Sequence, residues 1–189
     1  MSQAVSTVDV TRRLNHVEFV HRPGERHLVF ALFDLLGFET FEVMDGVIVM
    51  VVMDPPSFDM TENENYLAGS EVQPEQWAFD QALTNALRTQ PLEPLFASFL
   101  DVIAQKPYLG MHFGVHLSSP EKWEESVARL EDIDKCAPSL SGRVRLLNAF
   151  RRGDPGAPSR LNQAFLWTDV IASGSLALGQ RIELATSLP

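Results

Sequence analysis

The sequence predicts an α+β protein made of two βαβββ modules, with a helical hairpin inserted between them. Two observations carry this prediction. The plan of one strand, one helix and three strands occurs twice, and two histidine-bearing strands, LNHVEFVH and GMHFGVHL, hold matching places in the two copies. A repeat of this kind normally reflects one supersecondary unit that was duplicated and joined face to face. The predicted parts are an N-terminal arm at 1–13, a first module at 14–72, the helical insertion at 73–107 and a second module at 108–189.

The first module contains four expected strands and one expected helix. Polar and apolar residues alternate in the strands, and apolar residues recur every three or four positions in the helix. The dipeptide Asp45-Gly46 between two apolar runs is a strong signal for a hairpin turn. A polar loop with Pro55-Pro56 and TENEN precedes the last strand. In chain order the elements are a strand at 14–22, a helix ending at Gly37, strands at 38–44 and 46–54, and a short strand at 66–72.

The insertion carries two helical patterns, at 74–89 and 92–105, each with an apolar stripe. Two interpretations stay open for it. The hairpin either covers the core or a subunit interface, which is consistent with a homodimer, or forms a lid over a ligand cavity.

The second module repeats the plan of the first. Ser119 is the expected N-cap of its helix, with Pro120 at the first helical position. In chain order the elements are a strand at 109–119, a helix at 120–132, and strands at 143–150, 163–172 and 180–186.

Composition narrows the class of partner. The net charge of −10 and the pI near 4.9 argue against nucleic acid and against anionic membrane surfaces, both of which attract basic proteins. The sequence shows neither an apolar run of about 18 residues nor the apolar region of a signal peptide. A single cysteine, Cys136, cannot form an intramolecular disulfide. We therefore expect a cytoplasmic protein whose partner is a small molecule.

With this repeat and these strands, the chain resembles the vicinal-oxygen-chelate superfamily, which groups glyoxalase I, extradiol dioxygenases and the fosfomycin- and bleomycin-resistance proteins. The resemblance rests on the βαβββ repeat and on the segments LNHVEFV, ALFDLLGFE, GMHFGVH and IELA. It implies a half-open barrel of mixed β-sheet with flanking helices. It also implies one metal ion, bound by a histidine from the first strand of each module and a glutamate from the last strand of the second. On this chain those ligands are His16, His112 and Glu183.

Strand alternation is compatible with these three ligands. Ile182 and Leu184 lie on one face of their strand, which leaves Glu183 to point into a cavity. Two neutral imidazoles and one carboxylate form a facial triad that leaves coordination positions open for substrate and water. Iron, manganese, nickel or zinc would suit such a site, and the ligand types alone do not choose among them.

Other polar residues keep alternatives open. Glu71 is the candidate for a fourth ligand or a catalytic carboxylate, as the resemblance to glyoxalase I implies. His116 lies about 13 Å from His112 at roughly 3.3 Å per residue, too far to share one ion. It therefore either lines the far end of the cavity, with or without a structural hydrogen bond, or acts as an acid or base. Glu18 is either a pocket residue beside His16 or a solvated residue at the rim. Two further histidines are expected at the surface: His21 and His27.

These features predict a metal-dependent enzyme that acts on a small substrate with vicinal oxygens. Three protein ligands favour dioxygenase-like chemistry, whereas a fourth ligand from Glu71 would favour glyoxalase-like proton transfer. The alternative is a metal-free small-molecule binding protein of the bleomycin-resistance type. A third hypothesis is an interaction module whose cavity is vestigial. No basic cluster marks a site for phosphonate or carboxylate groups, so the substrate stays open.

Overall fold

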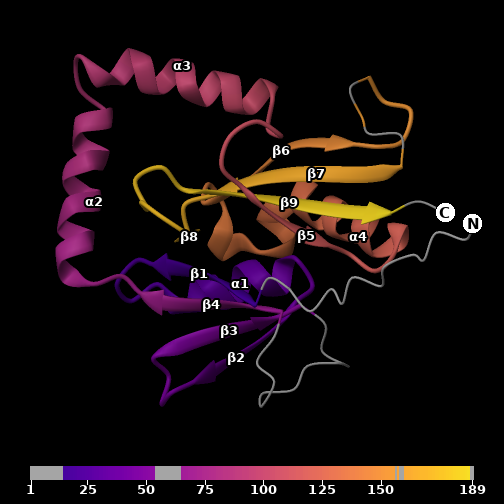
Figure 1. The fold of residues 1–189 in the computed structure, drawn as a ribbon, viewed down its shortest axis with the longest axis horizontal. Helices are drawn as coiled ribbons and strands as arrows, with labels where there is room; N and C mark the ends of the chain where they lie inside the picture. The colour runs from indigo at the N-terminus through magenta and orange to yellow at the C-terminus, as the bar shows by residue number, and fades with distance from the viewer. Residues whose placement is uncertain (1–14, 54–64, 156, 158–159, 188–189) are drawn as a thin grey trace, which may run out of the picture.

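The protein is described by a computed structural model that covers residues 15–53, 65–155, 157 and 160–187 (Figure 1). The expected N-terminal arm at 1–13 and nearly all of the polar loop at 55–65 lie outside the described residues. The first part of the chain contains β1 (His16–His21), α1 (Arg26–Leu35), β2 (Glu39–Val43), β3 (Ile48–Val52), β4 (Tyr66–Glu71), α2 (Pro74–Leu87) and α3 (Leu92–Gln105). The second part contains β5 (Phe113–His116), α4 (Pro120–Glu131), α5 (Ile133–Cys136), the 3-10 turn η2 (Pro138–Leu140), β6 (Val144–Phe150), β7 (Leu161–Thr168), β8 (Ile171–Ala172) and β9 (Gln180–Ser187).

The strands form two open mixed sheets, so the α+β class is confirmed. Sheet A has the order β2-β3-β4-β1-β8, and sheet B has the order β5-β9-β7-β6. In each sheet one pair of strands is parallel, β1 with β4 in sheet A and β5 with β9 in sheet B. Figure 1 shows sheet A below sheet B, with α1 beside sheet A and α4 beside sheet B.

One apolar core joins α1, α4 and residues from both sheets. Phe33 of α1 and Trp123 of α4 are fully buried in it, together with Leu166 and Leu184 of sheet B. The Trp123 indole also donates a hydrogen bond to the Leu184 carbonyl at 2.9 Å. Burial of these large side chains fixes the helices against the sheets, because apolar surface removed from water stabilises the packed arrangement.

Local signals were accurate at the turns and caps. The β2–β3 hairpin turns through residues 44–46, which all adopt positive φ (53°, 53° and 82°), as the Asp45-Gly46 pair predicted. The Ser119 hydroxyl accepts a hydrogen bond from the Lys122 amide at 3.3 Å, which confirms the predicted N-cap of α4.

Two expectations about the elements were wrong. The run at 163–172 is not one strand, because β7 ends at Thr168 and β8 pairs antiparallel with β1 of the other sheet. The Thr168 hydroxyl accepts a hydrogen bond from the Val170 amide at 3.0 Å, and this turn redirects the chain. The two inserted helices also do not form a hairpin, since α2 and α3 meet at a corner in Figure 1 instead of packing side by side.

Within the part of the chain that the structure describes, no helix has both the length and the apolar character needed to cross a bilayer.

Candidate functional site

The candidate site begins with a contact between His112 and Glu183. Their side chains, 21 % and 15 % exposed, bring Nε2 of the imidazole to 3.1 Å from Oε2 of the carboxylate. The other carboxylate oxygen accepts a hydrogen bond from the Gln163 amide. The His112 ring contacts the Phe165 ring in an edge-to-face arrangement, with the ring centroids 5.6 Å apart, and Phe165 is fully buried. Both carboxylate oxygens of Glu183 therefore have a hydrogen-bond partner, and the His112 ring packs against the buried Phe165 side chain.

Sheet register brings this pair together. β5 and β9 run parallel with Gly114 opposite Glu183, so His112 and Glu183 are diagonal neighbours on one face. A Cβ at Gly114 would lie 3.5 Å from Glu183 Oε2, which is ordinary contact. The glycine leaves the carboxylate room beside the imidazole. Ile182 and Leu184 are fully buried on the opposite face, as strand alternation predicted.

The hydrogen bonds of His112 fix the roles of its two ring nitrogens. Nδ1 lies 3.0 Å from the Gly110 carbonyl oxygen, which can only accept, so Nδ1 is the donor of this hydrogen bond. In the neutral tautomer, Nε2 directs its lone pair at Oε2 of Glu183, and both atoms are then electron-pair donors that face each other. The pair is therefore suited to binding a cation between these two atoms.

Arg181 fixes the segment that carries His112. Its guanidinium donates hydrogen bonds to the carbonyl groups of Leu109 and Met111, at 2.5 and 2.7 Å. The Arg181 residue is 7 % exposed, and burial lowers its pKa because the cation loses contact with water. Gly110 between these carbonyls has a φ of 82°, and a Cβ there would lie 2.7 Å from the guanidinium. The tight turn before His112 therefore depends on both Arg181 and Gly110.

His16 lies on the other sheet and lines the same cavity as His112. This cavity of about 320 Å³ is bounded by β1 and β4 of sheet A and by β5 of sheet B. The His16 ring stacks on Tyr66 with a centroid separation of 5.1 Å, and its Nε2 lies 3.5 Å from Glu18 Oε1. Its Nδ1 contacts the Asn15 side chain. His16 thus has its own partners, while His112 and Glu183 contact each other.

Glu71 lies away from this cavity. It pairs in register with His21 on β1, and His16 is five residues earlier, so Glu71 and His16 lie on opposite faces of sheet A. The Glu71 carboxylate accepts a hydrogen bond from the Gly24 amide at 2.9 Å. In sheet A the residue that corresponds to Glu183 is Ala68. Ala68 lies on β4 two residues after Tyr66, which pairs with His16, and Glu183 lies on β9 two residues after the position opposite His112.

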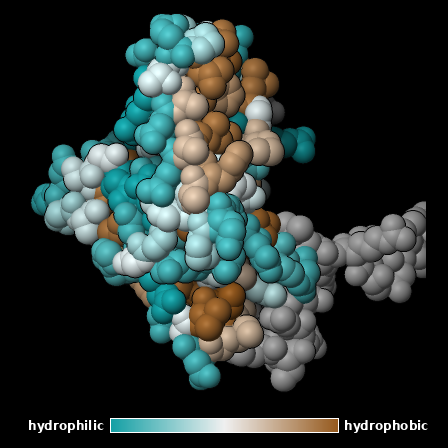
Figure 2. Space-filling model, turned by 90° about the vertical axis from the view of Figure 1, so that its left-hand side faces the viewer, coloured by the Kyte–Doolittle hydropathy of each residue, from teal (hydrophilic) through white to brown (hydrophobic). Residues whose placement is uncertain are grey.

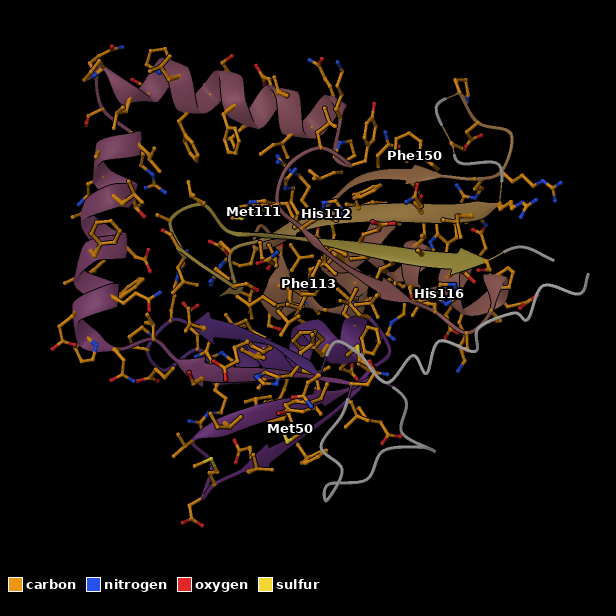
Figure 3. All side chains as sticks on the ribbon, in the orientation of Figure 1. Met50, Met111, His112, Phe113, His116 and Phe150 are labelled. Carbon is orange, nitrogen blue, oxygen red and sulfur yellow. The ribbon has the colours of Figure 1, made fainter. Side chains whose placement is uncertain are left out.

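His116 is at the other end of β5 from His112 (Figure 3). Its Nε2 lies 3.0 Å from the Ser187 hydroxyl and 3.1 Å from the Ser187 amide nitrogen. It also lines a larger cavity of about 920 Å³ that does not include His112.

Of the two histidines expected at the surface, His27 is exposed, but the prediction for His21 was wrong. His21 is fully buried, and its Nδ1 lies 2.9 Å from the Arg22 carbonyl oxygen. β8 pairs with β1 at His21 and closes the edge of the sheet, which no local pattern indicated.

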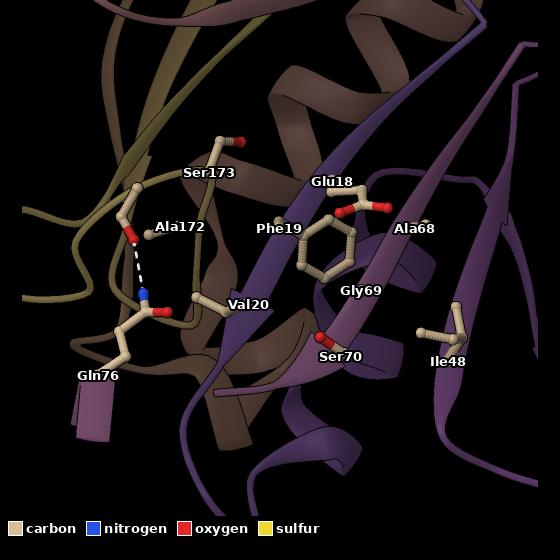
Figure 4. A pocket seen from close by; sticks show the side chains of 11 residues that line it. Glu18, Phe19, Val20, Ile48, Ala68, Gly69, Ser70, Gln76, Ala172 and Ser173 are labelled. Atoms are coloured by element: carbon tan, nitrogen blue, oxygen red, sulfur yellow. Dashed lines mark hydrogen bonds between the residues drawn. The ribbon is translucent and has the colours of Figure 1, made fainter. Parts of the chain in front are cut away.

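Two further cavities lie next to the first. One of about 270 Å³ shares Val17, His112 and Phe113 with it. The other, of about 350 Å³, is shown in Figure 4, where Glu18 and Ser70 border it and Gln76 of α2 donates a hydrogen bond to the Gly174 carbonyl at 3.2 Å. Among the described residues, none of the three cavities is lined by lysine or arginine, so an anion bound there would meet no permanently charged cation.

Sequence reasoning missed Gln163, Arg181 and Tyr66 as neighbours of the candidate ligands. Each contacts its partner across a strand pair or from a distant segment. Strand alternation could have put Gln163 and Phe165 on one face, but their pairing with Glu183 depends on the register of β7 with β9.

As arranged here, the described residues contain no group of three histidine, cysteine, aspartate or glutamate side chains that could hold a metal ion. His112 and Glu183 meet, and His16 faces the same cavity without joining them. Comparison with protein-family models gives no match, and neither does comparison with curated proteins.

Proposed function

We propose that this protein is a metal-dependent enzyme of the vicinal-oxygen-chelate type, which binds a small substrate with neighbouring oxygens between its two sheets. The observation that carries the proposal is the His112–Glu183 contact, together with the cavity that His112 and His16 line from the two sheets. The ligands would be His16, His112 and Glu183, and the ion iron, manganese, nickel or zinc.

The strand orders support the duplicated fold that this proposal assumes. Without β8, each half of the chain contributes four strands to one sheet. In both sheets these strands lie in the order second, third, fourth, first: β2-β3-β4-β1 in sheet A and β6-β7-β9-β5 in sheet B. In both halves the first strand pairs in parallel with the fourth, and a histidine lies at or just before the start of the first. We infer from this correspondence two βαβββ modules that face each other across the cavity as a half-open barrel.

The geometry of the His112–Glu183 pair fits a shared cation. Two ligand atoms about 2.1 Å from one ion and at right angles to each other lie about 3.0 Å apart. The observed separation of Nε2 and Oε2 is 3.1 Å. The Nδ1 hydrogen bond to Gly110 and the Gln163 hydrogen bond to Glu183 are outer contacts of the kind that orient metal ligands. His16 would complete the set by turning from Glu18 toward the cavity.

A bound divalent ion would supply a Lewis acid for the two oxygens of the substrate. The protein would supply orientation and exclusion of water. Phe165 and Phe113 provide apolar surface beside His112, and Tyr66 provides an aromatic face beside His16. The position of Ala68 where a fourth carboxylate would be needed favours three protein ligands, and hence the dioxygenase-like over the glyoxalase-like form.

The metal-binding test uses protein stripped with chelator and titrated with Mn(II), Ni(II), Zn(II) or anaerobic Fe(II) by calorimetry. We expect about one ion per chain, because the three ligands form one site. His112→Ala and Glu183→Gln should each weaken binding by roughly 100-fold or more, since each removes a direct ligand. His116→Ala is the matched control, because His116 is four residues from His112, at the other end of β5, and lines a different cavity. His16→Ala tests whether His16 is the third ligand, because it should weaken metal binding only if His16 contacts the ion.

A second candidate function is metal-free binding of a small molecule in the same cavity. It is favoured by the present partners of His16, which are Tyr66, Glu18 and Asn15. If none of the four ions binds, or if His112→Ala leaves binding unchanged, the metal-dependent proposal is wrong. Thermal stabilisation by neutral aromatic compounds, lost on Tyr66→Ala, would then support the binding protein.

A further inference from the structure

The helix α3 presents a row of apolar side chains that no other described element covers. The row consists of Leu92, Leu95, Phe99 and Val102, which are 38 %, 66 %, 47 % and 51 % exposed. We call these four residues the α3 stripe. Their spacing of three, four and three residues is the heptad spacing with which one helix packs along another.

The arm formed by α2 and α3 buries little against the rest of the chain. Ile103 is the one buried residue of α3, and Asp80 is the one buried residue of α2. Figure 1 shows α3 extending above sheet B, and Figure 2 shows apolar side chains gathered at the top of the molecule, over this arm. A 14-residue helix is only marginally stable by itself, so an uncovered apolar row of this kind indicates a missing packing partner.

We propose that the α3 stripe packs against the α3 stripe of a second copy of this chain, with the two helices antiparallel. A two-fold axis that crosses the α3 stripe midway between Leu95 and Phe99 would form four apolar layers. Leu92 would meet Val102 of the second copy, and Leu95 would meet Phe99 of the second copy, each pair occurring twice. The stripe is thus complementary to itself, as a two-fold interface requires.

The spacing of the α3 stripe itself favours a second copy. The intervals of three, four and three residues are the same in both directions along the helix, so two antiparallel copies bring all four layers into register. Tyr108, Leu109 and Met111, at 48 %, 50 % and 85 % exposure, follow α3 and lie beyond this overlap.

The α3 stripe offers no charge by which a charged partner would be recognised. The α3 stripe contains no ionisable side chain, so an acidic or basic partner would find no complementary charge on it. The chain carries a net charge of −10, so two copies repel each other at long range. Added salt should therefore strengthen the pair by screening this repulsion.

The first test measures the mass of the full chain by sedimentation at tens of micromolar protein. We expect a dimer whose dissociation constant rises about 100-fold or more in the variants Leu95→Glu and Phe99→Glu, because each puts a charge into an apolar layer. Ala97→Glu and Ala104→Glu are the matched controls, since both alanines are exposed on α3 outside the stripe. All four changes are at exposed positions, and circular dichroism verifies that the fold is kept.

The second test determines the orientation by disulfide cross-linking. The exposed Cys136 is first replaced in Cys136→Ser, and Leu92→Cys and Val102→Cys are then combined in one chain. Within one helix these positions are about 15 Å apart, too far for an intramolecular bond. The double variant should form cross-linked dimers on oxidation, whereas either single variant should not.

Three results would overturn the proposal. They are a wild-type chain that stays monomeric at this concentration in 0.5 M salt, a dimer that survives Leu95→Glu and Phe99→Glu, and cross-links that form equally well in a single-cysteine variant.

Discussion

Gly69 is a position where the lack of a side chain is a packing requirement. β1 and β4 pair with Phe19 opposite Gly69, and the Phe19 ring lies over the glycine. A Cβ built at Gly69 would overlap the Cε2 and Cζ atoms of that ring. Phe19 is 2 % exposed and packs against Phe33 at a centroid separation of 5.6 Å, so its ring would have to give up these contacts to make room for a Cβ.

We therefore expect Gly69→Ala to lower the free energy of unfolding by about 2 kcal/mol, because overpacking a core forces its side chains from their rotamers. Urea denaturation measures the change. Gly174→Ala is the control, since no atom lies within 4 Å of a Cβ there, and it should change stability by less than about 0.5 kcal/mol. Equal midpoints for the wild type and Gly69→Ala would show that Phe19 can move aside.

At the scale of elements, the connector between α3 and β5 is held by a side chain from β9. Arg181 donates hydrogen bonds to the Leu109 and Met111 carbonyl groups, and the Gly110 carbonyl between them accepts from His112. A buried cation that binds backbone carbonyls orders a segment without secondary structure of its own. The connector is therefore part of the candidate site, because it carries His112, one of the three proposed ligands.

Arg181→Met keeps much of the side-chain volume but leaves these carbonyls without their donor. We expect faster amide hydrogen exchange at 107–112, because the connector opens more often. Under the proposed function, metal affinity should fall by roughly 10- to 100-fold, as for other outer contacts of metal ligands. Arg145→Met is the control, because Arg145 is exposed and lies over the Trp167 ring at 5.9 Å. Unchanged exchange at 107–112 would assign the order of the connector to other contacts.

At the scale of the whole molecule, a cluster of half-buried charges joins the two halves of the chain. Arg143 contacts Glu25 at 2.7 Å and Asp169 at 2.5 Å, and Asp169 also contacts Arg22 at 2.7 Å. Burial by itself lowers the pKa of Arg143, but the hydrogen bonds and charges of Glu25 and Asp169 outweigh it and raise the pKa. The cluster ties the start of α1 to the ends of strands in sheet B.

Arg143→Met should lower the free energy of unfolding by about 2 kcal/mol, because it leaves Glu25 and part of Asp169 without a partner in a half-buried place. Arg151→Met removes a comparable contact with Glu124, at 2.7 Å, on the exposed surface. It should cost less than about 1 kcal/mol, since water screens exposed pairs. Urea denaturation at one pH and one ionic strength compares the two variants. Similar losses would mean that burial adds nothing to the cluster.

The local features of this chain were predictable because short stretches of sequence encode them. The Asp45-Gly46 turn, the Ser119 cap and the position of Glu183 on the face opposite Ile182 and Leu184 each depend on a few neighbouring residues. The burial of His21 was not predictable in the same way, because it follows from β8, a two-residue strand that returns from the second half of the chain. A strand this short has no periodicity to detect.

By itself the sequence determined the order of the strands and helices apart from β8, α5 and η2, their apolar faces, and two of the residues that meet at the candidate site, His112 and Glu183. Only the tertiary structure decided that Gln163 and Arg181 secure this pair, that Glu71 lies on the opposite face of sheet A from His16, and that α3 leaves its stripe uncovered. The physical reason is the separation along the chain over which each interaction acts. Alternation, caps and turns act over a few residues, whereas register and packing between distant segments depend on how all the faces fit together.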